Sequence, residues 1–370
     1  MGNRSSSVQP AGPPPLLTAA VMGDLSKFQE EWNGADSVQV LDRQDNNVLH
    51  ALFSCRGREG AQCQEILNQI HASLSTKAQI QNAYQAKNSL GCTPLWILVA
   101  YGNVDLLKHV QEKFAAIDSS VLFQDMLRVP NHQGDSPFLA TCSMGNTDMI
   151  RFLKQVILTP EQFTTALTAS NQKGTTPLQI IVGNSHLTLL QLVLQEGDSS
   201  VEKQLMQLNA AGLSLFHICS ERNAHDALQA LLSFMIDNKA ADDKKSDVET
   251  LEQVLALKDK NGANTIHVAA FCGNKETVQL WITVIQKACA TNDNKTNAVD
   301  LLDKMDGQAR TPYWLAMVQG KDAVGALLAD AGVDTEHPNM VKEIKEAQEQ
   351  RQARQQQRPQ PVDGSALLGR

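Results

Sequence analysis

Residues 88–108 of this 370-residue chain read NSLGCTPLWILVAYGNVDLLK and predict two short helices joined by a tight connection. Pro94 is favoured in the first turn of a helix, because its missing N–H needs no partner there and its φ is already helical. Thr93 can accept a hydrogen bond from an unpaired N–H of that turn as an N-cap. Gly102 can adopt the left-handed conformation that ends a helix. The stretch therefore predicts a turn, a helix, a tight stop and a second helix.

The position of Pro94 recurs along the chain. Residues 171–178 (NQKGTTPL) repeat the frame almost unchanged, and residues 306–314 (DGQARTPYW) are the last full copy. Some copies have Val, Leu or Thr in place of the proline. The eight equivalent positions are residues 15, 48, 94, 137, 177, 215, 265 and 312. A helix pair with one apolar face needs a neighbour to cover that face, so the recurrence predicts a stack of pairs.

The spacing between these positions predicts additional short helices. Positions 15 and 48 lie 33 residues apart, whereas positions 215 and 265 lie 50 apart. Capping residues followed by acidic or amide side chains, as in Thr159-Pro160-Glu161-Gln162, indicate where the inserted helices begin. We expect inserted helices within residues 76–84, 119–127, 159–168, 199–208, 246–257 and 296–303.

The recurring frame resembles the ankyrin-repeat family, whose pattern is D-x-x-G-x-T-P-L-H-x-A-A-x-x-G-H-x-x-I-V. The resemblance implies an all-α ankyrin-repeat solenoid of about eight repeats over residues 15–334, divergent because of its insertions and its replaced prolines. Residues 327–334 (LLADAGVD) resemble the family's usual ending and would cap the stack. Residues 1–14 are expected to be a disordered tail, and residues 335–370 a charged, Gln-rich, solvated helix followed by a flexible tail.

Composition restricts the function. Hydrophobic residues make up 42% of the chain and charged residues 19%, which is typical of a folded protein. The formal net charge of −8 gives no basic footprint, so we expect no nucleic-acid binding. The seven cysteines form no C-x-x-C pair and no zinc spacing, so we expect free thiols, no metal and no cofactor. No stretch has the apolar length of a membrane span.

No catalytic motif is present in the sequence. His50, His217 and His267 fall on the His of the T-P-L-H pattern, where the resemblance implies a structural role, with hydrogen bonds between neighbouring turns. No G-x-S-x-G, glycine-rich phosphate loop or H-E-x-x-H occurs, so we expect no enzyme activity. The alternative is an enzyme or modulator whose site lies in an inserted loop, at residues 56–62 (RGREGAQ) or 237–245 (DNKAADDKK).

The resemblance implies binding of a protein partner on the concave face, which is built from turn tips and from exposed positions of the first helices. Packing does not fix these positions, and Tyr101, Met144 and Phe271 are the best anchors among them. The tip candidates are Arg43, Gln44, Ser89, Leu90, His132, Gln133, Asp135, Gln172, Lys173, Lys260, Asn261, Gln308 and Arg310. The first-helix candidates are Tyr101, Met144, Glu221, Arg222, Phe271 and Gln319.

The N-terminus, MGNRSS, fits the N-myristoylation pattern M-G-x-x-x-[ST] with Gly2 as acceptor; the alternative is an unmodified polar tail. One acyl chain anchors a protein only marginally. We expect a monomeric, non-catalytic scaffold in the cytoplasm, peripheral at a membrane if Gly2 is acylated. With its long insertions and its charged, Gln-rich C-terminal tail, the array is loosely similar to ankyrin-repeat effectors that intracellular bacteria inject into host cells. An ordinary eukaryotic adaptor is the competing source.

Overall fold

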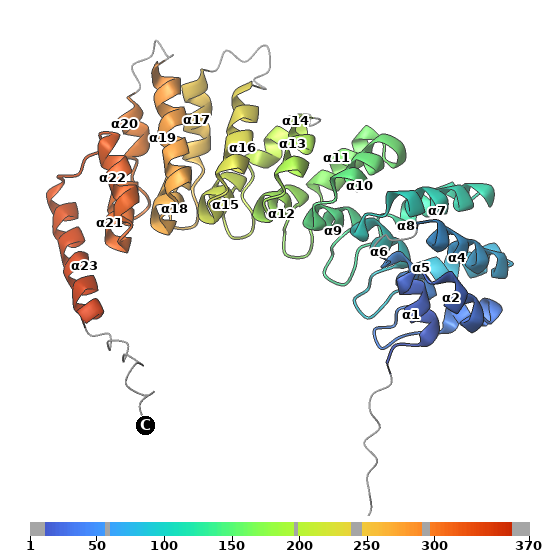
Figure 1. Ribbon diagram of the computed structural model, residues 1–370. Helices are drawn as coiled ribbons and strands as arrows, with labels where there is room; N and C mark the ends of the chain where they lie inside the picture. The colour runs from blue at the N-terminus through green and yellow to red at the C-terminus, as the bar shows by residue number, and fades with distance from the viewer. Residues whose placement is uncertain (1–11, 56–59, 196–198, 238–245, 291–296, 357–370) are drawn as a thin grey trace, which may run out of the picture. The chain divides into compact units, whose positions relative to one another are not determined.

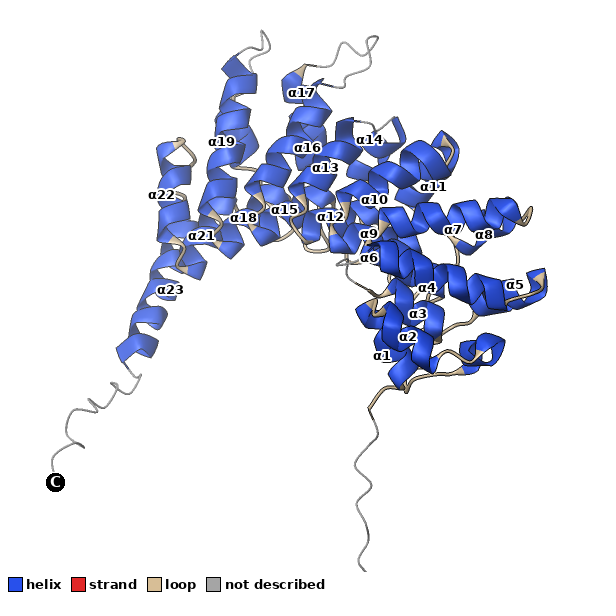
Figure 2. Ribbon diagram, turned by 45° about the vertical axis from the view of Figure 1, so that its right-hand side comes forward, coloured by secondary structure: helices blue, strands red, loops and turns tan. Residues whose placement is uncertain are grey.

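The computed structural model describes residues 12–55, 60–195, 199–237, 246–290 and 297–356. Every regular element within these ranges is a helix and none is a β-strand, as Figure 2 shows, so the predicted all-α class is confirmed. The chain divides into two compact units, Met1–Glu196 (unit 1) and Gly197–Arg370 (unit 2). Each unit is described below by itself.

Unit 1 consists of five helix pairs. In Figure 1 the first helices of consecutive pairs lie side by side, and so do the second helices. The first helices are α1 (Pro15–Met22), α3 (Val48–Phe53), α6 (Pro94–Tyr101), α9 (Pro137–Met144) and α12 (Pro177–Gly183). The second helices are α2 (Leu25–Glu31), α4 (Gly60–Ser73), α7 (Val104–Ala116), α10 (Thr147–Phe152) and α13 (Leu187–Gln195).

Short helices connect the pairs of unit 1, as the intervals in the sequence predict. They are α5 (Lys77–Gln85), α8 (Ser120–Met126) and α11 (Pro160–Thr168), which confirm three predicted insertions. Two further elements were not predicted. A 3-10 helix, η1 (Gly34–Gln39), follows α2, and a π-helical turn, η2 (Leu153–Ile157), extends α10.

Unit 2 repeats the same plan with three helix pairs. Its first helices are α15 (Leu215–Arg222), α18 (Thr265–Cys272) and α21 (Pro312–Gln319), and its second helices are α16 (His225–Asp237), α19 (Lys275–Ala290) and α22 (Asp322–Asp330). The inserted helices are α14 (Ser199–Leu205), α17 (Asp247–Ala256) and α20 (Ala298–Leu302). They confirm the remaining three predicted insertions within the described residues.

All eight predicted positions are the first residues of helices. The residue before each of seven of them supplies the N-cap: Thr93 Oγ1, for example, accepts from the Trp96 N–H at 3.2 Å. Where the proline is replaced, Asn47, Ser214 and Asn264 cap the helix in the same way. In these seven helices a capping side chain is present with or without the proline, whereas α1 begins at Pro15 without one.

Second helices and inserted helices supply much of the core. Tyr84 of α5 contacts Phe114 of α7 edge-on at 5.0 Å between ring centroids, and Phe114 contacts Phe123 of α8 at 5.7 Å. All three rings are buried. Because burying one such ring contributes about 2 kcal/mol, the inserted helices contribute directly to the stability of the fold.

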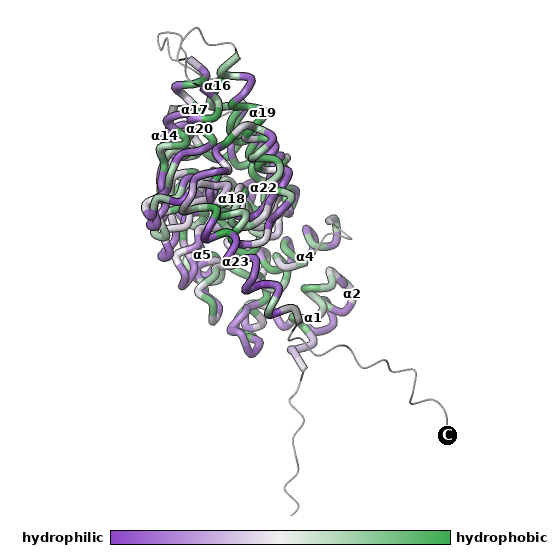
Figure 3. The backbone as a smooth tube through the Cα atoms, turned by 90° about the vertical axis from the view of Figure 1, so that its left-hand side faces the viewer, coloured by the Kyte–Doolittle hydropathy of each residue, from purple (hydrophilic) through white to green (hydrophobic). Residues whose placement is uncertain are grey.

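The C-terminal helix α23 (Pro338–Gln356) corrects one expectation. Its sequence is largely hydrophilic, as Figure 3 shows, yet the helix packs on α21 and buries Met340 and Ile344. Its Arg351 donates to the Met317 carbonyl at the end of α21, at 2.9 Å. Helix α21, the first helix of the last pair, is therefore covered by α23. The expectation of a merely solvated helix after residue 334 was wrong.

Candidate partner-binding surface

Seven turns in the described residues share one hydrogen-bond pattern, and each precedes a first helix. In the turn before α6, Asn88 Oδ1 accepts from the N–H groups of Leu90 and Cys92, at 3.0 and 2.9 Å. The equivalent side chains in the other turns are Asp42, Asn131, Asn171, Asn209, Asp259 and Asp306. An Asn or Asp oxygen thus closes every turn and fixes the geometry of its tip.

The turns lie close enough to bond to one another through their backbones. Ser89 N–H donates to the Gln44 carbonyl at 2.8 Å, and His132 N–H donates to the Leu90 carbonyl at 3.0 Å. At Gly262, where φ is +76°, an added Cβ would lie 2.5 Å from the backbone nitrogen of Gly307 in the next turn. Glycine there permits both the left-handed conformation and the close approach.

Three histidines bridge neighbouring turns, as predicted. His50 Nε2 bonds to the Cys92 carbonyl at 2.9 Å, His217 Nε2 to Ala263 O at 3.1 Å, and His267 Nε2 to Arg310 O at 3.0 Å. In each case the acceptor is the residue immediately before the next N-cap. Burial lowers the pKa of all three imidazoles, so each is neutral near pH 7 and donates through Nε2.

Two tryptophans occupy the same place as these histidines, which sequence reasoning missed. Trp96 Nε1 donates to the Asp135 carbonyl at 2.8 Å, in the next turn. Trp314 Nε1 donates to the Glu343 carboxylate of α23 at 2.8 Å. Both tryptophans could have been identified from the sequence, because each is the third residue of a first helix and carries a ring N–H. The family pattern, which has His there, concealed it.

Most predicted tip residues are exposed, but two are not free. Asp135 is half-buried, and its carboxylate accepts from Asn171 Nδ2 of the next turn at 2.8 Å. Arg310 is half-buried, pairs with the buried carboxylate of Asp306 at 2.6 Å and lies over the Trp314 ring. The expectation that packing leaves these positions free was wrong for both. The exposed tip residues are Arg43, Gln44, Ser89, Leu90, His132, Gln133, Gln172, Lys173, Lys260, Asn261 and Gln308.

Five of the six first-helix candidates are exposed. They are Met144, Glu221, Arg222, Phe271 and Gln319, and Met144 and Phe271 expose 52% and 49% of their surface. Tyr101 is only half-buried rather than exposed, because it lines a groove between α1, α3 and α6. The expected full exposure of Tyr101 was therefore wrong.

Two grooves gather eight of the predicted residues. The unit 1 groove, of about 370 Å³, brings Gln44, Leu90 and Tyr101 together with Met22 of α1, whose side chain is 73% exposed. Met22 was not among the residues predicted from the sequence, because it lies in the first repeat, which is abbreviated. The unit 2 groove, of about 420 Å³, is lined by Glu221, Asn261, Phe271, Gln308 and Arg310, among others.

Within the described residues, the other predicted features give no chemical site. Burial raises the pKa of the Cys142 and Cys219 thiols, which disfavours the nucleophilic thiolate. In the described part of the chain no three His, Cys, Asp or Glu side chains lie together as metal ligands. Gly2, residues 238–245 of the segment 237–245 and residues 56–59 of the segment 56–62 lie outside the described residues. Nor is any described helix both long and apolar enough to cross a bilayer.

No protein-family model matches the chain, and no curated protein has a significantly similar sequence.

Proposed function

We propose that this chain is an ankyrin-type repeat scaffold that binds another protein through its turn tips and first helices. The observation that supports this most strongly is the recurrence of one turn, closed by the same two side-chain hydrogen bonds, before seven first helices. Rigid turns hold their tip side chains in fixed positions at little further entropic cost, which favours recognition. The tips also border both grooves.

The unit 2 groove suggests the chemistry of its partner. Phe271 offers a half-exposed ring, which is a suitable centre for an interface. Glu221 is exposed beside it, whereas the Arg310 guanidinium is already paired with Asp306. The groove therefore presents an aromatic anchor and an available carboxylate. It suits a protein segment with an apolar side chain next to a lysine or arginine.

The experiment is an affinity capture from eukaryotic lysate with matched variants. The unit 2 groove variant combines Phe271→Ala, Asn261→Ala and Gln308→Ala, all at exposed positions. The unit 1 groove variant combines Met22→Ala and Leu90→Ala. The control combines Val121→Ala and Val156→Ala, which are 74% and 54% exposed and line neither groove.

A protein that the wild type and the control capture, and that one groove variant loses, would support the proposal. Loss of the partner should accompany an unchanged helical circular dichroism spectrum, since the replaced side chains are exposed. Equal capture by all four proteins would contradict it and direct attention to the inserted loops.

We further propose that myristoylation of Gly2 tethers the scaffold to membranes. A bacterial effector in a host cell and a eukaryotic adaptor would both meet the required transferase. Labelling with an alkyne analogue of myristate in eukaryotic cells should mark the wild type and not Gly2→Ala. An unlabelled wild type would contradict this part of the proposal.

A further inference from the structure

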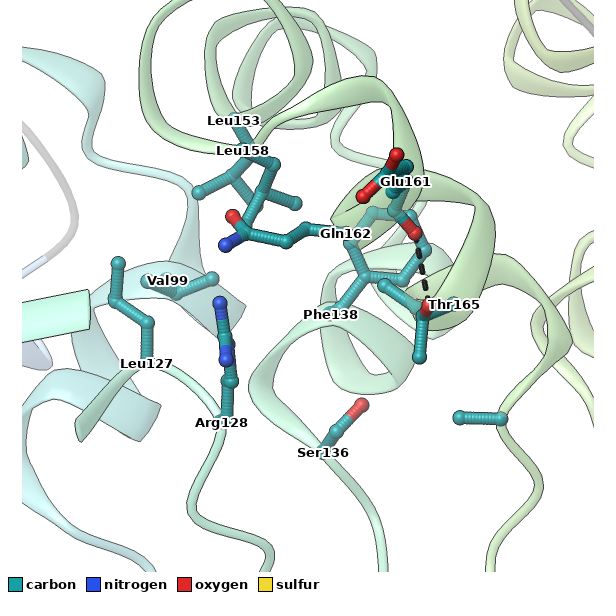
Figure 4. Close-up of a pocket in the computed structure, with 12 residues that line it drawn as sticks. Val99, Leu127, Arg128, Ser136, Phe138, Leu153, Leu158, Glu161, Gln162 and Thr165 are labelled. Carbon is teal, nitrogen blue, oxygen red and sulfur yellow. Dashed lines mark hydrogen bonds between the residues drawn. The ribbon is translucent and has the colours of Figure 1, made fainter. Parts of the chain in front are cut away.

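A third cavity, of about 380 Å³, lies in unit 1 beside the inserted helix α11 (Figure 4). Its deep wall consists of buried apolar side chains, among them Leu127, Phe138 and Leu153. None of the predicted partner-binding residues lines it, so it is separate from both grooves. Small-molecule sites of this size are typically apolar with a few polar groups.

The π-helical turn η2 forms part of this cavity. Leu158 N–H donates to the Leu153 carbonyl at 2.7 Å, five residues back, which is the π-helical pattern. Figure 4 shows Leu153 and Leu158 next to each other on the cavity wall. Single π-turns are uncommon and often occur at functional sites. The distortion of α10 thus coincides with the cavity.

Two side chains of opposite charge line the cavity, Arg128 and Glu161. Arg128 is an exposed residue that lines the cavity; its side chain points into the cavity in Figure 4 and forms no ion pair with any described residue. Glu161, on the other side, also lacks an ion pair, but it lies in the first turn of α11, where the helix dipole favours a negative charge. The Arg128 guanidinium is therefore the solvent-exposed cation of the cavity that has neither an ion pair nor a helix dipole to compensate it, which suits a carboxylate.

We propose that this cavity binds a small monocarboxylate with an apolar chain, such as a medium-chain fatty acid. Arg128 pairs with the carboxylate, and the Gln162 side-chain amide, which faces Arg128 across the cavity, donates a second hydrogen bond. The chain lies against Phe138, Leu153 and Leu158. This binding does not depend on the proposed protein partner, because the two use different residues.

The test is calorimetric titration of the full chain with sodium octanoate and with its neutral analogue octanamide. We expect octanoate to bind the wild type, and Arg128→Gln to weaken it by roughly tenfold, because a charge-assisted hydrogen bond is lost. Octanamide should bind the wild type about tenfold more weakly than octanoate for the same reason. Ala166→Phe, which fills the cavity from α11, should abolish binding.

Two control variants make the result specific. Arg151→Gln removes an exposed arginine of α10 that does not line the cavity, and should leave octanoate binding unchanged. Glu161→Gln removes the nearby negative charge and should leave binding unchanged or strengthen it. If Ala166→Phe fails to fold, Leu158→Phe serves as the second filled variant.

The proposal is overturned if octanoate does not bind the wild type, or if Arg128→Gln and Arg151→Gln have the same effect. Loss of binding in Glu161→Gln would also overturn it, because the ligand would then be recognised as a cation. Partner capture by the groove variants is scored separately, so either proposal can fail alone.

Discussion

The two units use the same turn but differ in how neighbouring turns are joined. In unit 2, the third residue of every first helix is a ring N–H donor to the next element: His217, His267 and Trp314. In unit 1, only His50 and Trp96 do so, whereas α9 has Leu139 at that place and α12 has Gln179, which bonds back to its own N-cap. The Asn or Asp of the turn precedes all seven of the first helices that follow α1. The turn side chain is therefore the essential element and the ring donor an addition.

The units also differ in the face that their first helices present. The five first helices of unit 1 contain no Asp, Glu, Lys or Arg, whereas α15 of unit 2 exposes Glu221 and Arg222. If the two faces bind parts of one partner, unit 1 would bind an apolar segment and unit 2 a charged one.

The largest expected effect comes from the turn carboxylate that is most deeply buried. Asp306→Ala should lower the free energy of unfolding by about 3 kcal/mol, because it removes two turn hydrogen bonds and leaves Arg310 without its partner. Asp42→Ala, in an equivalent turn without an arginine partner, should cost only about 1–2 kcal/mol. Urea denaturation measures both; equal losses would show that the ion pair adds nothing.

The next effect tests the close approach of neighbouring turns. Gly262→Ala should lower the free energy of unfolding by about 2–3 kcal/mol, because the new Cβ meets the Gly307 backbone and φ is +76°. Gly34→Ala has a positive φ as well but no neighbour within 4 Å, and should cost only about 1 kcal/mol. Thermal denaturation distinguishes the two, and similar losses would refute the role of turn contact.

The ring donors should have a smaller effect with a distinctive pH dependence. His217→Phe removes hydrogen bonds to Ala263 and Ser214 and should cost about 1–2 kcal/mol at pH 7. Because burial lowers the pKa of His217 below 6.5, its contribution is present above pH 6.5 and is lost as the pH falls below that value. The difference in unfolding free energy between wild type and variant should therefore narrow as the pH falls below about 6.5. A constant gap in urea midpoints would contradict this account.

The smallest expected effect is an increase in the free energy of unfolding. Ala309 has φ of +58° at the place where five of the seven turns have glycine. Ala309→Gly should raise the free energy of unfolding by about 0.5–1 kcal/mol, because it relieves the left-handed conformation more than it costs in chain entropy. Asp45→Gly is the matched change in unit 1, at φ of +59°. A loss of stability in both variants, measured by thermal denaturation, would show that neither residue is strained.

The recurring frame allowed all eight helix starts and six inserted helices to be predicted from the sequence, because caps and turn residues act locally. The interturn histidines were also predictable, since they share one place in the frame. What failed depends on tertiary contacts: Arg310 looks like a free tip residue until Asp306 and Trp314 surround it. Met340 and Ile344 are the only apolar side chains that the described part of α23 buries, too few for a clear sequence pattern. The π-turn at residues 153–157 has no recognisable sequence signal.

The most direct test of the scaffold proposal is amide hydrogen exchange of the full chain with and without its captured partner. We predict slower exchange in the turns and first helices that border the grooves, including residues 88–102 or residues 259–272. The inserted helices α8 and α11, on which neither groove depends, should exchange at unchanged rates. Protection confined to α8, α11 or α23, with unaffected turns, would contradict the proposal that turn tips and first helices form the binding surface.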